Sequence, residues 1–348
     1  MTQTIESLLQ PFHWQGRVDT EVGVDSNRLL RWHQVMQSDV TQMVNNSMVL
    51  LGLASDAGVA RNLGRIGARF GPNAIRAMLA NLPVINTDLR LYDAGNVVCV
   101  ETEVDQKCSD ESVHPNLFST LEIAQEAFIT QATALLNQGA FVVGLGGGHE
   151  IAYASFMGLE RHLKQITQTK TGKKPTIGIV NFDAHLDLRS ATQATSGTPF
   201  KQISDYCAQQ QMPFHYACFG VSEFANTPAL FDRANQSGVL YRYDRDMNLV
   251  QLPNIQTQLA QFIESVDALY VTICLDVLPA AVAPGVSAPA GFGVALEVIE
   301  ILLKQLMLSG KVRLMDVAEC NPLFDRDHQT ARVAARLIAS ALRLSEKI

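Results

Sequence analysis

The sequence predicts an α/β protein built around a parallel β-sheet, and three observations support this fold class. Six short apolar runs have the near-continuous hydrophobicity of strands that are buried on both faces. Stretches with a helical pattern separate these runs, as in successive βαβ units. Polar clusters follow four of the runs, and an open parallel sheet binds its ligands beyond the carboxyl ends of its strands. We therefore expect one large α/β domain with a ligand site at that edge.

The predicted elements follow one another along the chain without an internal repeat. Helical patterns at 119–139 and 295–310 each end at a glycine, which is a common stop signal for a helix. Residues 1–44 are expected to form an N-terminal arm and residues 45–348 the domain. The two tryptophans of the arm could pack against a neighbouring subunit or fold back on their own. The predicted strands are 47–54, 140–146, 176–182, 215–220, 268–276 and 311–319.

Composition narrows the class of partner. The chain has 348 residues, of which 47% are hydrophobic and 18% charged, and this balance allows a large core. Its net charge of −7 argues against nucleic acid or an anionic membrane surface as a partner. The six cysteines form no CxxC pair, and no apolar run reaches the roughly 18 residues of a membrane span. We expect a cytoplasmic protein with reduced thiols that acts on a small molecule.

The segment NFDAHLDLR, at 181–189, places Asp183, His185 and Asp187 at alternating positions. Alternate residues of extended backbone point to one side, so these side chains can face a common point. His149 follows a run of three glycines, which allow close backbone approach, and Asp276 adds a further carboxylate. Carboxylates and imidazoles in this combination suit Mn²⁺, Fe²⁺ or Zn²⁺. The sequence therefore predicts a metal site.

Each of these residues also has a structural explanation when it is taken alone. A D-x-H-x-D segment can be a salt-bridged surface turn, His149 can cap a helix, and Asp276 can cap a turn. All five groups, however, follow predicted strands that end at one edge of the sheet, which favours metal binding. Five protein ligands are many for one catalytic ion but suit two ions, roughly 3.5–4 Å apart, that share a bridging carboxylate.

Several stretches of the chain resemble the ureohydrolases, the family of arginases, agmatinases and formimidoylglutamases. The resemblance is carried by GLGGGHE at 144–150, NFDAHLDLR at 181–189 and TICLDVLPAAVAPGVSAPAGFG at 272–293. It extends through 56–79 and 316–338. The arm segments FHWQGRVDTE and RLLRWHQ resemble the N-terminal arm of the formimidoylglutamase branch in particular.

The resemblance implies a single three-layer αβα domain with an eight-stranded, mostly parallel sheet. It also implies two Mn²⁺ ions per subunit: His149 and Asp187 would hold one ion, His185 and Asp276 the other, and Asp183 would bridge them. The implied activity is hydrolysis of N-formimino-L-glutamate to L-glutamate and formamide by a metal-activated hydroxide, in histidine degradation. Family members commonly form trimers or hexamers, so a homo-oligomer is expected.

One position departs from the family pattern. The third signature is usually Ser-x-Asp-x-Asp, with the first aspartate bridging both ions, but Cys274 takes that place here. Three explanations stay open. Cys274 could bind as a thiolate, which would favour Zn²⁺, Fe²⁺ or Co²⁺. It could instead remain a buried thiol and leave the second ion weak or absent, or it could lose its ligand function on oxidation.

The substrate implied by the resemblance carries two carboxylates, and planar guanidinium groups bind carboxylates through paired hydrogen bonds. Arg189 lies two residues after Asp187, and Asn62 and Arg65 lie together in a glycine-containing segment. We expect Arg189 first, and then Arg65 or Asn62, to bind the substrate. The alternative for each arginine is a structural role in which it holds backbone carbonyls.

The loop ATSGTPF, at 194–200, is similar in kind to the arginase loop that meets the amino-acid end of the substrate. Ser196, Gly197 and Thr198 are therefore expected to contact the substrate, with an ordinary turn as the alternative. A histidine that some family members carry on or just after this loop is absent here. Its absence disfavours arginase or agmatinase activity.

By resemblance, Glu319 in DVAECNP pairs with the amidine nitrogens of the substrate, and Asp187 carries a proton to the leaving amine. Both are expected to be catalytic; the structural alternative for Glu319 is a strand-end carboxylate paired with an arginine. Two other functions stay open. One is a ureohydrolase for a guanidino acid such as guanidinobutyrate, and the other is a metal-poor, non-catalytic homologue, which Cys274 would explain.

Overall fold

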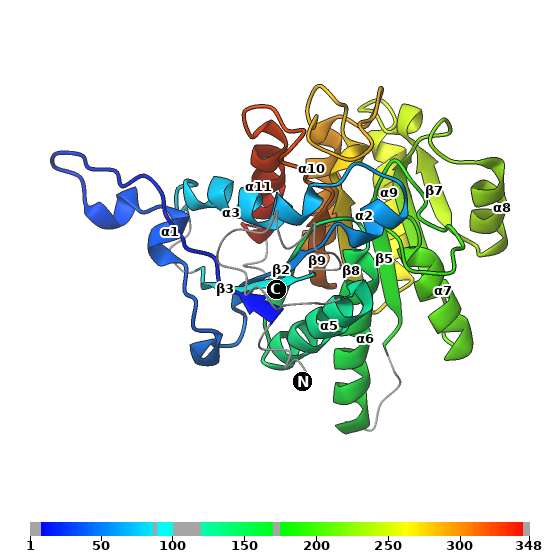
Figure 1. Ribbon diagram of the computed structural model, residues 1–348, viewed down its shortest axis with the longest axis horizontal. Coiled ribbons are helices and arrows are strands. Elements are labelled where there is room, and N and C mark those ends of the chain that lie inside the picture. The colour runs from blue at the N-terminus through cyan, green and yellow to red at the C-terminus, as the bar shows by residue number, and fades with distance from the viewer. Residues whose placement is uncertain (1–7, 86–88, 100–119, 170–174, 344–348) are drawn as a thin grey trace.

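A computed structural model describes residues 8–85, 89–99, 120–169 and 175–343, which fold into three layers (Figure 1). A single sheet forms the middle layer. Helices α5, α6, α7 and α8 pack against one face, and α3, α9, α10 and α11 pack against the other. No helix in this part of the chain is long and apolar enough to cross a membrane. The helices span α1 (Trp32–Val35), α2 (Ala57–Arg61), α3 (Gly71–Ala80), α5 (Leu121–Asn137), α6 (Ile151–Thr169), α7 (Pro199–Gln209), α8 (Pro228–Gln236), α9 (Leu252–Glu264), α10 (Leu296–Leu308) and α11 (Gln329–Leu342).

The sheet has the strand order β1-β3-β2-β4-β9-β8-β5-β6-β7. Strands β2 to β9 run parallel to one another, which confirms the predicted eight-stranded parallel sheet for the described residues. A ninth strand, β1, pairs antiparallel with β3 at the edge. The strands span β1 (Leu9–Gln10), β2 (Met48–Ala54), β3 (Leu91–Val98), β4 (Phe141–Gly146), β5 (Ile177–Phe182), β6 (His215–Val221), β7 (Leu240–Tyr243), β8 (Ala268–Cys274) and β9 (Val312–Ala318).

All six predicted strands are present, as β2, β4, β5, β6, β8 and β9, and they include the apolar centre of the sheet. The predicted helices correspond to α5 and α10; Ser119 of the first lies outside the described residues, as does Cys108. The sequence missed β3, whose polar Asp93 and Asn96 break the apolar pattern. Both are buried because Arg76 binds them, with Nη2 2.8 Å from Asp93 Oδ1 and Nη1 2.5 Å from Asn96 Oδ1.

The described part of the N-terminal arm folds back on its own chain. Strand β1 extends the sheet next to β3, and Trp14 Nε1 donates a hydrogen bond to Asp93 Oδ2 at 2.8 Å. Trp32 is buried in the core cluster that also contains α3. These contacts correspond to the alternative in which the arm folds back on its own subunit.

The four central strands, β4, β9, β8 and β5, are neighbours in the sheet. Each is followed by one of the polar clusters that the sequence singled out, so segments far apart along the chain meet at one sheet edge. This arrangement creates the site described next.

Candidate metal centre and substrate cavity

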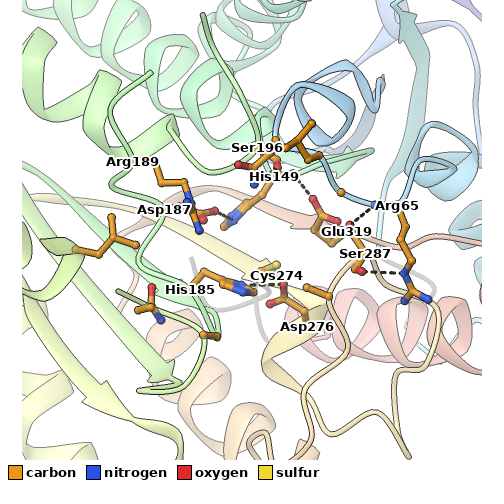
Figure 2. Close-up of a pocket in the computed structure, with 17 residues that line it drawn as sticks. Arg65, His149, His185, Asp187, Arg189, Ser196, Cys274, Asp276, Ser287 and Glu319 are labelled. Carbon is orange, nitrogen blue, oxygen red and sulfur yellow. Dashed lines mark hydrogen bonds and ion pairs between the residues drawn. The ribbon is translucent and has the colours of Figure 1, made fainter. Parts of the chain in front are cut away.

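The ends of the central strands bring six potential metal ligands together. Asp183, His185 and Asp187 follow β5, and His149 follows β4. Cys274 is the last residue of β8, and Asp276 lies in the 3₁₀ turn directly after it. Figure 2 labels five of these six ligands and shows their side chains converging on one cavity: His149, His185, Asp187, Cys274 and Asp276. We call this set the polar floor; it comprises His149, Asp183, His185, Asp187, Cys274 and Asp276.

The distances arrange the polar floor around Asp183. His149 Nδ1 lies 2.9 Å from Asp183 Oδ2 and 2.8 Å from Asp187 Oδ2. His185 Nδ1 lies 3.5 Å from Asp183 Oδ1 and 3.1 Å from Asp276 Oδ2. The two oxygens of Asp183 therefore face different imidazoles. Two sets of donor atoms, each within 4.8 Å of one another, share this residue: His149, Asp183 and Cys274 in one, and Asp183, His185 and Asp276 in the other.

Neighbouring polar groups fix the orientation of the polar floor. His149 Nε2 lies 3.0 Å from Thr272 Oγ1 on β8, and Asn181 Nδ2 donates to Asp183 Oδ2 at 3.1 Å. Asn226 holds the loop between the β5 ligands, since its Oδ1 accepts from Leu186 N and its Nδ2 donates to Ala184 O. Sequence reasoning missed these supports. Thr272 and Asn181 could have been found as polar residues inside apolar strands, whereas Asn226 has no local signal.

Burial and charge perturb the floor strongly. Burial alone would raise the pKa of Asp183, but hydrogen bonds with His149 and His185 hold it well below its usual range. Burial, with the charge of Asp183, raises the pKa of Asp187 to about 6. Burial and the Asp183 carboxylate also raise the pKa of the Cys274 thiol well above its usual value. A thiolate at this position therefore requires an adjacent cation.

The residues present fit divalent cations. Asp276 Oδ1 and Glu319 Oε2 are buried and have no hydrogen-bond partner among the described residues. Buried carboxylate oxygens are normally paired with donors or with a metal. Oxygen, imidazole and sulfur donors at one sheet edge, with the Asp276 oxygen left over, make a site that two cations sharing Asp183 would complete.

The two predicted catalytic residues lie in an unusual backbone conformation. Asp187 has φ +47° and Glu319 has φ +70°, in the left-handed region that non-glycine residues rarely adopt. Glu319 Oε1 accepts a hydrogen bond from His149 N at 3.0 Å, which directs its other oxygen toward the cavity. Burial, with the charge of Asp276, raises the pKa of Glu319 to about 8. Such conformations persist where the surrounding contacts enforce them, often at functional sites.

A cavity of about 330 Å³ opens over the polar floor. Five of the predicted substrate-binding residues line it: Asn62, Arg65, Arg189, Ser196 and Glu319. The sequence analysis did not single out the remaining lining residues, which lie on loops and, for Leu230, on α8: Leu63, Gly64, Ala225, Asn226, Leu230, Ser287 and Ala288.

The structure places two of the predicted substrate contacts, Gly197 and Thr198, outside the lining of this cavity. Thr198 Oγ1 accepts from Thr195 N and donates to Thr195 O, within the turn that precedes α7. The carbonyl of Gly197 accepts from Arg189 N at 2.9 Å. These hydrogen bonds shape the loop that carries Ser196, as the ordinary-turn alternative describes.

The two predicted arginines play different parts. The Arg65 guanidinium donates to Ser287 O at 2.9 Å and to Val286 O at 2.5 Å, and it stacks on Phe324 at 4.1 Å. It therefore joins two loops of the cavity, which is the structural alternative. The Arg189 guanidinium is exposed and has no hydrogen-bond partner among the described residues. We call Asn62, Arg189 and Ser196 the recognition wall; Figure 2 shows Arg189 and Ser196 beside the floor.

A parallel three-layer fold with a carboxylate and imidazole centre at the ends of its central strands defines the class of protein. The arginase family model matches residues 46–343, and the chain belongs to the arginase family. Within it, the chain is 50% identical to a formimidoylglutamase of Ralstonia nicotianae, over 94% of each chain. It is 47% identical to a formimidoylglutamase of Vibrio vulnificus, over 95% of each.

Two solved structures confirm the fold. A formimidoylglutamase from Bacillus subtilis superimposes with a TM-score of 0.73 at 22% identity, over 94% of both chains. A formiminoglutamase of Trypanosoma cruzi with Mn²⁺ gives a TM-score of 0.70 at 24% identity, over 85% of this chain and 92% of that one. At these identities the likeness concerns the architecture alone.

Proposed function

We propose that the protein is a metal-dependent hydrolase that converts N-formimino-L-glutamate and water into L-glutamate and formamide, in histidine degradation. Relatives that are 44–50% identical over more than nine-tenths of the chain are formimidoylglutamases. The structural observation that carries the proposal is the cavity that joins the polar floor to Arg189, whose guanidinium has no partner in the part of the chain that the structure describes. A substrate with both an amidine carbon and carboxylates matches these two surfaces.

We further propose that the polar floor holds two divalent cations, with Mn²⁺ as the expected metal. His149, Asp187 and Cys274 would serve one ion, His185 and Asp276 the other, and Asp183 both. Ions bound there would supply a water of lowered pKa as the nucleophile. A thiolate from Cys274 would soften the first site and shift its preference toward Zn²⁺, Fe²⁺ or Co²⁺.

The chain's own groups supply the remaining chemistry. Arg189 pairs with a substrate carboxylate, with Asn62 and Ser196 beside it, and this places the formimino carbon over the floor. The free oxygen of Glu319 accepts a hydrogen bond from the amidine nitrogen. Asp187 takes the proton of the attacking water and delivers it to the glutamate nitrogen as the bond between that nitrogen and the formimino carbon breaks.

The test is a product assay of the Mn²⁺-loaded protein with N-formimino-L-glutamate, 4-guanidinobutyrate and L-arginine. We expect L-glutamate and formamide from the first substrate and at least about a hundredfold lower kcat/KM for the other two. Preference for guanidinobutyrate would select the alternative ureohydrolase. Release of ammonia with N-formyl-glutamate would show that the other C–N bond breaks.

Metal analysis separates these activities from the non-catalytic alternative. After loading and desalting, we expect close to two ions per chain, whereas a metal-poor homologue would retain none and hydrolyse none of the substrates. We also propose a cytoplasmic location, a homo-oligomer and a catalytic domain that begins near residue 45. Light scattering of the purified protein tests the second of these.

A further inference from the structure

Glu150 is a buried carboxylate that the reaction described above does not use. It directly follows His149, is 1% exposed and lies outside the cavity lining. Its Oε1 accepts two hydrogen bonds, both at 3.0 Å, from Ser55 Oγ and from Gly58 N. One carboxylate therefore ties the segment that carries a candidate metal ligand to the start of α2.

The backbone of Gly58 continues this connection to the recognition wall, because its N–H binds Glu150 and its carbonyl group binds the wall. Its carbonyl oxygen accepts hydrogen bonds from Asn62 N and from Ser196 N, each at 3.0 Å. The Asn62 side chain in turn donates from Nδ2 to Ser196 Oγ at 3.3 Å. A displacement of the Gly58 backbone would thus move Asn62 and Ser196, which line the cavity from different loops, together.

The backbone of Gly58 is tightly packed against Glu150 and Ser196. A Cβ atom on Gly58 would lie 2.6 Å from the Glu150 carboxylate and 2.9 Å from Ser196 N. A Cβ atom on Gly148 would lie 2.0 Å from Glu150 Oε2. Glycine at both positions lets the Glu150 carboxylate lie between the segments that contain Gly58 and Gly148. The length of the Glu150 side chain therefore sets the separation of these segments.

We propose that Glu150 is a positioning residue that acts through the backbone of Gly58. It fixes Asn62 and Ser196 relative to the metal centre and so determines the affinity for the substrate. It acts without touching the substrate, because it lies outside the cavity lining. The proposal rests on the proposed function, since substrate affinity is what it predicts.

The central experiment compares Glu150→Asp with Glu150→Gln. Aspartate withdraws the carboxylate by one methylene, whereas glutamine keeps an acceptor oxygen at full reach. We expect Glu150→Asp to raise KM about tenfold while kcat stays within about twofold and the bound Mn²⁺ per chain is unchanged. Glu150→Gln should keep KM near that of the wild type.

Gln125→Ala is the matched control. Gln125 Nε2 donates to the backbone carbonyl of Glu150 at 2.8 Å, from α5 and away from the cavity. This variant also removes a buried contact with residue 150, so it should lower Tm without changing KM. If Glu150→Asp behaves like Gln125→Ala, losing stability at constant KM, Glu150 is merely structural and the proposal is wrong.

A double-mutant cycle with Asn62→Ala tests the route. If Glu150 acts through Asn62, the rise in KM of Glu150→Asp combined with Asn62→Ala is smaller than the product of the single effects. The proposal is wrong if the rise in KM of the double variant equals the product of the single effects. It is also wrong if Glu150→Asp loses bound Mn²⁺ or if Glu150→Gln raises KM. Each variant is assayed on whichever of the three substrates the wild type hydrolyses. A wild type silent toward N-formimino-L-glutamate but active on another therefore rejects the proposed function alone.

Discussion

The polar floor and the recognition wall form two sides of one cavity, yet they are built differently. The floor consists of side chains at the ends of three central strands, β4, β8 and β5, and His149 and Asp183 are 1% and 0% exposed. The wall consists of side chains on loops, and Asn62 and Arg189 are exposed. The sheet register fixes the floor, while hydrogen bonds between loops hold the wall. Metal affinity and substrate affinity should therefore respond to different substitutions.

The largest effect should come from the residue at the centre of the floor. We expect Asp183→Asn to lower kcat/KM by about a thousandfold or more, because one carboxylate serves both donor sets. Activity with saturating Mn²⁺ and metal content after desalting measure it. Asp327→Asn, whose side chain is 81% exposed, is the control and should change neither. A variant with two ions and full activity would show that the sets do not share Asp183.

The next effect contrasts the two arginines. Arg189→Ala should raise KM for N-formimino-L-glutamate by about a hundredfold, through loss of a charge-assisted pair, and should change kcat less. Arg65→Ala should instead lower Tm by a few degrees, because it releases the carbonyls of Val286 and Ser287. Steady-state kinetics and thermal unfolding of both variants separate the two roles. A steep rise in KM for Arg65→Ala with unchanged Tm would restore it as a substrate ligand.

The role of Cys274 can be decided by spectroscopy. If the thiolate binds, the Co²⁺-loaded protein should show strong sulfur-to-cobalt absorption in the near ultraviolet, and Cys274→Ser should lose it. Cys218→Ser is the matched control, since Cys218 is buried beside the floor, with Sγ 3.4 Å from His185 O, but belongs to neither donor set. Persistence of the band in Cys274→Ser would exclude ligation.

The same contrast explains how far the sequence could predict the site. The floor residues follow predicted strands at fixed short offsets, so their convergence could be predicted from the pattern. The role of Arg65 could not, because its carbonyl partner on Ser287 lies 222 residues away. Strand β3 was missed for a similar reason, since its buried Asp93 is paired by Arg76 and Trp14, which lie 17 and 79 residues away. Long-range polar pairing leaves no local signal.

The smallest expected effect concerns the support behind the floor. Thr272→Val keeps the shape of the side chain but removes the hydroxyl 3.0 Å from His149 Nε2. The imidazole then loses the partner that fixes its tautomer and ring orientation, so we expect Mn²⁺ affinity to fall about tenfold. Calorimetric titration of the metal-free protein measures this affinity. Because Thr272 touches the floor and not the wall, KM at saturating Mn²⁺ should not change. If KM rose together with the metal dissociation constant, the floor and the wall would be coupled through the sheet, and the separation drawn between them would fail.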